Sequence, residues 1–182
     1  MPFIVGGFPS IDVTEMVLAG IDGTGARVVE IGIPFSDPIA DGPIIASAMH
    51  DTLVAGTRIE AILDTVARAR PHTEAAMIAM VSHSIVHRLG DDAFVRRLHA
   101  SGFDGLIVPD LDPGVADGLL HVIDETVCKD TELVPLVRLQ FRGLAEFERK
   151  AFWFRNVTDA RGRDFDGSVV LGALGSSRTI YG

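Results

Sequence analysis

The sequence has little cysteine, tryptophan and tyrosine: one residue of each occurs among 182 residues. A single cysteine, Cys128, excludes a framework of internal disulfide bonds and is typical of a protein from a reducing compartment. We interpret Cys128, near the end of a predicted helix, as a small packing residue rather than a nucleophile. The length suits one domain, residues 1–182, with a substantial core.

Positive charge is also scarce, since 16 Lys and Arg stand against 25 Asp and Glu, for a net charge of -9. Nucleic acids and anionic membranes are bound through basic patches, so neither is expected as the main partner. No apolar run is long enough to span a bilayer, and the first residues lack the pattern of a signal peptide. We therefore expect a cytoplasmic protein. The six scattered histidines show no metal-site spacing, and no metal is predicted.

What the sequence does have is an alternation of apolar runs with helical periodicity. Strands are predicted over residues 3–7, 28–33, 75–81, 106–108 and 133–137, and helices after Ser10, over 44–55, after Thr57, over 91–100 and over 115–127. Ser10 and Thr57 are the predicted N-caps. The spacing in the first helix predicts one apolar face made by Val13, Met16, Val17 and Ile21.

The predicted strands are continuous apolar runs, which is typical of a parallel sheet covered by helices. An open doubly wound sheet and a (β/α) barrel both fit this pattern, and periodicity leaves the choice open. No GxGxxG follows the first strand, which argues against a dinucleotide-binding fold. After Val137 the alternation is lost, and no structure is predicted for residues 138–182.

Glu30 interrupts the apolar run of residues 28–33. A carboxylate buried there would have a raised pKa, which suits a proton shuttle near neutral pH. A structural glutamate, bonded to backbone amides or to an arginine, is an equally good interpretation. The loop after it supplies further acceptors, namely Ser36, Asp37 and Asp41, at the C-terminal end of a strand, where α/β proteins carry their chemistry. Local turn bonding by the two aspartates is the alternative.

The stretch EIGIPFSDPIADGP, residues 30–43, strongly resembles the signature of the tryptophan synthase alpha chain family. PFIVGGFPS, residues 2–10, resembles the first strand and turn of that family, and GFDGLIVPDLD, residues 102–112, is similar to its fourth strand. The resemblance covers roughly residues 2–136. It implies a TIM (β/α)8 barrel, and a lyase that cleaves indole-3-glycerol phosphate to indole and glyceraldehyde 3-phosphate in tryptophan biosynthesis.

The same resemblance implies roles for particular residues. Glu30 matches the acid/base of the family, and Asp41 matches the aspartate that binds the indole N–H. Phe3 and Ile45 fall where the family lines its indole pocket, and Asp37 is a candidate for contact with a partner. That partner is the tryptophan synthase beta chain, in an alpha2-beta2 complex. No cofactor is implied here, because pyridoxal phosphate belongs to the beta chain.

The sequence departs from the family in several respects. About five βα units are recognisable, so we expect an incomplete barrel, and a truncation or a frame change near Leu136 is one hypothesis for the loss of resemblance. Residues 169–177 are the only candidate phosphate cradle. His83 lies where the family often has tyrosines, and a loop histidine bonded to backbone is favoured over an extra acid/base.

Two other functions remain open at this point. The first is a catalytically incompetent remnant that at most binds the beta chain. The second is another sugar-phosphate barrel enzyme, which would need a Schiff-base lysine at a strand end. Lys129 and Lys150 lie in helical contexts, which argues against it.

Overall fold

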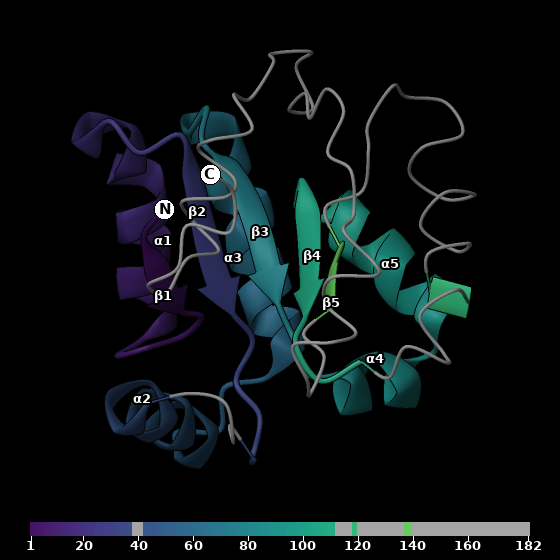
Figure 1. Cartoon of the computed structure of the whole chain (residues 1–182). Helices are drawn as coiled ribbons and strands as arrows, with labels where there is room; N and C mark the ends of the chain where they lie inside the picture. The colour runs from purple at the N-terminus through teal and green to yellow at the C-terminus, as the bar shows by residue number, and fades with distance from the viewer. Residues whose placement is uncertain (38–41, 112–117, 120–136, 140–182) are drawn as a thin grey trace, which may run out of the picture.

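The computed structural model in Figure 1 describes residues 1–37, 42–111, 118–119 and 137–139. One five-stranded sheet runs in the order β1-β2-β3-β4-β5, and every neighbouring pair is parallel. The strands are β1 Phe3–Val5, β2 Val28–Gly32, β3 Ala76–Met80, β4 Gly105–Val108 and β5 Val137–Leu139. The helices are α1 Ile11–Gly20, η1 Ile21–Thr24, α2 Pro43–Val54, α3 Ile59–Ala69, η2 Arg70–His72, α4 His83–Leu89 and α5 Asp91–Ala100.

The strand order decides between the two architectures left open by the sequence. A doubly wound sheet reverses its strand order at a switch point. Here each strand is added beside the preceding one, so the sheet grows in one direction through all five strands. That is the arrangement of consecutive strands in a (β/α) barrel.

The sheet has two apolar faces, because successive side chains in a strand point to opposite sides. The outer face joins α1, α3 and α5 in one large core cluster, and these helices lie on the same side of the sheet in Figure 1. The residues of β2 and β3 in this cluster include Val29, Ile31, Met77 and Ala79. The inner face is a smaller cluster that includes Val5, Val28, Ala48, Met49, Ala76, Ile78, Met80 and Ile107. Most residues of β1 to β4 are therefore buried, as the continuous apolar runs predicted.

The N-cap of α1 is confirmed, and the predicted apolar face is confirmed only in part, since Ile21 is buried in the outer cluster and Val13 and Val17 are partly buried. The Ser10 side chain accepts a hydrogen bond from Val13 N at 3.3 Å. Met16 is 65% exposed, whereas Thr14 and Leu18 are buried. The Thr14 hydroxyl accepts a hydrogen bond from Gly7 N, in the turn after β1, at 2.9 Å. We infer that this bond sets the rotation of α1, a constraint that apolar spacing does not reveal.

Two further predictions need correction. The N-cap of α3 is Arg58 rather than Thr57, and it makes no side-chain capping bond. His83 is not a loop residue, because it begins the helix α4. The predicted fifth strand is found as β5 at Val137–Leu139, and residues 133–136 lie outside the described residues, as does Cys128. No helix within the described ranges is long and apolar enough to cross a membrane.

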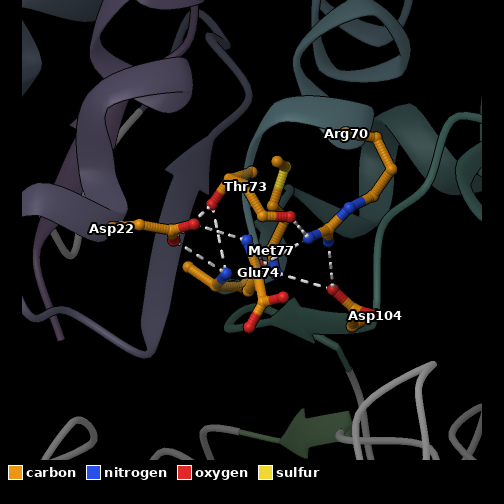
Figure 2. A network of polar contacts seen from close by, with 7 residues as sticks. Asp22, Arg70, Thr73, Glu74, Met77 and Asp104 are labelled. Carbon is orange, nitrogen blue, oxygen red and sulfur yellow. Dashed lines mark hydrogen bonds and ion pairs between the residues drawn. The ribbon is translucent and has the colours of Figure 1, made fainter.

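The loops before β3 and β4 are joined by a polar network, shown in Figure 2. Asp22, in η1, accepts hydrogen bonds from the Thr73 hydroxyl at 2.7 Å, from Glu74 N at 2.7 Å and from Ala75 N at 3.1 Å. Partial burial raises the pKa of Asp22, but these hydrogen bonds and the charge of Arg70 outweigh it and hold the pKa below its ordinary value of 3.8.

The second half of the network centres on Asp104, whose side chain is 7% exposed. Its carboxylate accepts hydrogen bonds from Arg70 Nη1 at 2.9 Å and from Met77 N at 2.8 Å. The same guanidinium donates to the carbonyl oxygens of Thr73 and Ala75. This network fixes the N-terminal ends of β3 and β4, the end of a barrel that is associated with stability.

Candidate functional site

Glu30 lies on the inner face of β2. Its two neighbours in the strand, Val29 and Ile31, are fully buried in the outer cluster, so alternation turns Glu30 the other way. Its register partners on either side are Phe3 in β1 and Ile78 in β3. The side chain is partly buried beside apolar residues of the inner cluster. The sequence thus places one carboxyl group on the face that becomes the interior of a barrel.

Phe3 occupies the space that Gly32 leaves on this face. A Cβ atom on Gly32 would lie 2.6 Å from Phe3 Cζ and 3.2 Å from Met49 Cε. The Phe3 ring and the end of the Met49 side chain therefore both lie against the Gly32 backbone, two residues beyond Glu30. Sequence reasoning missed Gly32 and Met49. A glycine inside an apolar strand is the signal that a neighbouring group approaches closely.

Ile45 reaches the same cluster from α2. This helix starts at Pro43, after the N-cap Gly42, and lies beyond the C-terminal ends of the strands in Figure 1. Ile45 is partly buried against the inner cluster, and Met49, one turn later, is fully buried in it. The structure therefore packs Phe3 and Ile45 against one cluster, on the face that carries Glu30, and their role in lining an indole pocket stays a prediction.

The two aspartates of the loop have different outcomes. Asp37 is exposed, and its carboxylate accepts a hydrogen bond from the adjacent Ser36 hydroxyl at 2.8 Å. This is a local bond of the kind offered as the alternative interpretation, and contact of Asp37 with a partner stays a prediction. Asp41 lies outside the described residues, as do residues 169–177, so their predicted roles also stay predictions.

A second cluster of polar residues lies just beyond the C-terminal ends of β3 and β4, and sequence reasoning assigned it no role. Asp110 accepts hydrogen bonds from the Ser82 hydroxyl at 2.7 Å and from His83 N at 2.7 Å. Ser82 in turn accepts a hydrogen bond from Ser84 N at 3.2 Å and caps α4. The sequence signal that could have indicated this role is the position of Asp110 just after an apolar strand. A carboxylate at the end of a strand lies close to the loop that follows the neighbouring parallel strand. Asp110 therefore ties the two loops together.

The described residues contain no group of three or more His, Cys, Asp or Glu side chains that could hold a metal ion. The described residues of the site combine a carboxyl group with an apolar surface. Glu30 supplies the ionisable group, and the inner cluster supplies a wall of Phe3, Ile45, Met49 and Met80. Such a site fits an aromatic or aliphatic substrate that must gain or lose a proton.

Comparison with known proteins gives the family. The family model of the tryptophan synthase alpha chain matches residues 1–143. A tryptophan synthase alpha chain of Clostridium kluyveri is 39% identical over 137 residues, which are 75% of this chain and 51% of that relative. The corresponding protein of Gloeobacter violaceus is 43% identical over 119 residues, covering 65% of this chain and 43% of its own length.

Solved structures agree with the sequence relatives. Tryptophan synthase from M. tuberculosis superimposes with a TM-score of 0.64 at 34% identity, over 69% of this chain and 50% of that one. The tryptophan synthase A-subunit of Pyrococcus furiosus also gives 0.64, at 32% identity, over 69% and 51%. These matches and the parallel strand order confirm the predicted class, an α/β protein of the TIM-barrel family.

The chain spans about half the length of the curated relatives that it matches. The matched half includes β1 to β4 and the stretch around Glu30, on which the sequence resemblance rests. The family match covers most of the chain, and the fold agrees with it independently. This chain therefore belongs to the tryptophan synthase alpha chain family.

Proposed function

We propose that this chain acts as a tryptophan synthase alpha subunit, a cytoplasmic carbon–carbon lyase that cleaves indole-3-glycerol phosphate to indole and glyceraldehyde 3-phosphate. The observation that carries the proposal is the position of Glu30, on the inner face between Phe3 and Ile78. Membership of the family supports it. The proposal requires no cofactor in this chain.

Glu30 is the proposed acid/base. Cleavage is a retro-aldol reaction, in which C3 of the indole must gain a proton so that the ring can accept the electrons of the breaking C–C bond. The hydroxyl on the adjacent side-chain carbon must lose its proton as the aldehyde forms. One carboxyl group next to both atoms serves both transfers, and general acid–base catalysis of this kind contributes about 10²- to 10⁴-fold to the rate.

The apolar wall is the proposed indole pocket. Phe3 lies in register with Glu30, and Ile45 packs against the same cluster from α2. An aromatic ring held there would have its C3 within reach of the inner face of β2. Asp41 is the proposed anionic partner of the indole N–H, where it would stabilise the positive charge that develops on the ring.

The proposed partner is the tryptophan synthase beta chain, in an alpha2-beta2 complex. The solved relatives from M. tuberculosis are structures of tryptophan synthase, which supports this assignment. Asp37, exposed on the loop after β2, is the proposed contact residue. A second candidate function is a catalytically incompetent remnant that binds the beta chain alone. This second function is favoured by the short length of the match, since the chain covers about half of its relatives' length.

The decisive experiment measures indole release from indole-3-glycerol phosphate by the full chain, with and without purified beta chain. Glu30→Gln should reduce the rate by at least about 10²-fold, because the amide cannot transfer the proton. Glu60→Gln is the matched control, since Glu60 lies on α3, on the outer side of the sheet, and its ion pairs to described residues are long, at 3.7 and 3.9 Å. This control should retain the rate.

Equal and nonzero rates for the chain and for Glu30→Gln would refute Glu30 as the proton carrier. A chain that binds the beta chain, as followed by sedimentation, yet releases no indole would establish the second candidate function. Binding and cleavage are thus measured separately.

A further inference from the structure

The helix α4 carries a pair of histidines that no proposed function uses. His83 and His87 are one turn apart, and side chains at i and i+4 lie on the same face of a helix. Their ring centroids are 5.9 Å apart, with ring planes inclined by 41°. Two imidazoles bound to one ion through Zn–N bonds of about 2.0–2.1 Å have centroids about 5 to 6 Å apart. The rings are therefore spaced to share an ion.

The two rings lie on the side of α4 that faces away from the core. Ile85 and Val86 are buried in the outer cluster, which fixes the face that α4 turns to the core. His87 is exposed and His83 is half-buried. Within the described ranges neither ring is held by a hydrogen bond or an ion pair to another side chain, so the nitrogens are available.

The start of the helix is fixed from a neighbouring loop. Asp110 accepts a hydrogen bond from His83 N at 2.7 Å, and the Ser82 cap bonds to the same carboxylate at 2.7 Å. The backbone that carries the first ring is therefore held in place before any ion binds. Pre-organisation of this kind lowers the entropic cost of binding.

We propose that His83 and His87 form a binding site for a divalent first-row transition-metal ion at the C-terminal edge of the sheet. Two imidazoles favour Cu(II), Ni(II) or Zn(II), following the general order of affinities, and disfavour Mg²⁺ and Ca²⁺, which prefer oxygen ligands. No third ligand lies close among the described residues. The site therefore leaves positions on the ion open to water or to an external ligand, and the ion should exchange readily with chelators.

The test is a calorimetric titration of the full chain, without an affinity tag, using Cu(II) and then Mg²⁺. We expect one Cu(II) ion to bind per chain, with Mg²⁺ giving no signal. His83→Ala and His87→Ala should each weaken Cu(II) binding by about tenfold or more, because the second ligand acts at high effective concentration. Alanine favours helix, and both rings lie outside the core, so the fold is retained.

Two controls distinguish binding by the His83/His87 pair from binding that depends only on the number of histidines. His99→Ala removes an exposed histidine of α5 and should leave binding unchanged. The double variant His87→Ala/Arg88→His keeps six histidines but turns the second ring by about 100° around the helix, to about 140° from His83, at 3.6 residues per turn. It should bind as weakly as His87→Ala.

The proposal is overturned if the chain does not bind Cu(II), or if His99→Ala weakens binding as much as His87→Ala. It is also overturned if the double variant binds like the original chain. Because the readout is binding, the outcome is independent of whether the chain cleaves indole-3-glycerol phosphate.

Discussion

Replacement of Asp104 by alanine should be among the most damaging single changes at the N-terminal end of the sheet. The substitution removes the partner of Arg70 Nη1, at 2.9 Å, and the acceptor of Met77 N, at 2.8 Å. The Asp104 side chain is 7% exposed and that of Arg70 is 21% exposed, so water replaces these bonds only in part. Figure 2 shows both contacts, which connect the residue before β4 to Arg70 of η2 and to Met77 of β3.

The size of the effect follows from burial. Removing one partner of a fully buried ion pair costs about 3–5 kcal/mol. Arg70 keeps some exposure and its two carbonyl acceptors, which places Asp104→Ala near the lower end, at about 3 kcal/mol. Asp104→Asn keeps an oxygen for Met77 N and should cost about half as much, in the range of a lost charge-assisted hydrogen bond of about 1.5 kcal/mol.

Urea unfolding followed by circular dichroism measures this effect. With a slope of about 1–3 kcal/mol per molar urea, the midpoint of Asp104→Ala should fall by about 1 M or more. Asp92→Ala is the control, because it breaks the exposed pair with Arg96, in which both side chains are more than half exposed. Exposed pairs contribute little, so its midpoint should hardly move.

Hydrogen exchange at the Met77 amide gives a local measure of the same event. It should accelerate in Asp104→Ala and far less in Asp104→Asn. If Asp104→Ala and Asp92→Ala shift the midpoint equally, burial does not distinguish the two pairs and the reasoning is refuted.

Two further predictions concern acid stability and the close approach at Gly32. The folded state holds the pKa of Asp22 below 3.8, so the contribution of this carboxylate to stability should be present above that value and lost as the pH falls through the lower, folded-state pKa. The difference in urea midpoint between the chain and Asp22→Asn should therefore shrink below about pH 4. A difference that stays constant with pH would contradict this. Gly32→Ala should destabilise the chain by about 1–3 kcal/mol, since its Cβ would lie 2.6 Å from Phe3 Cζ, whereas Gly20→Ala, with open space around it, should not.

Alternation and capping made much of the fold predictable. Because Val29 and Ile31 face the outer cluster, the inward direction of Glu30 follows from its position alone. The cap at Ser10 and the bounds of α5 were also predicted, since both depend on local chemistry. The barrel-type order of the strands was not predictable from periodicity, and it came from the family resemblance.

What the sequence did not reveal depends on contacts between distant segments. The buried face of α1 includes Thr14, whose hydroxyl is bonded to the turn after β1. The helix α4 has seven residues, and its first turn is held by Asp110 from the next loop. Neither contact leaves a periodic signal, because each depends on a single side chain meeting a backbone amide of another segment, seven residues away for Thr14 and 27 for Asp110.

The carboxylates at the N-terminal end of the sheet and the one on its inner face have different chemical settings, and this separates stability from activity. At the N-terminal end, Asp22 and Asp104 are bonded to backbone amides of the loop and strand that they stabilise. Glu30, in the middle of β2, lies on the inner face beside apolar side chains. Substitution of Asp104 should therefore lower the urea midpoint whether or not the chain is an enzyme. Substitution of Glu30 should instead act on the rate of indole release, because a carboxyl group beside an apolar surface contributes more to proton transfer than to packing.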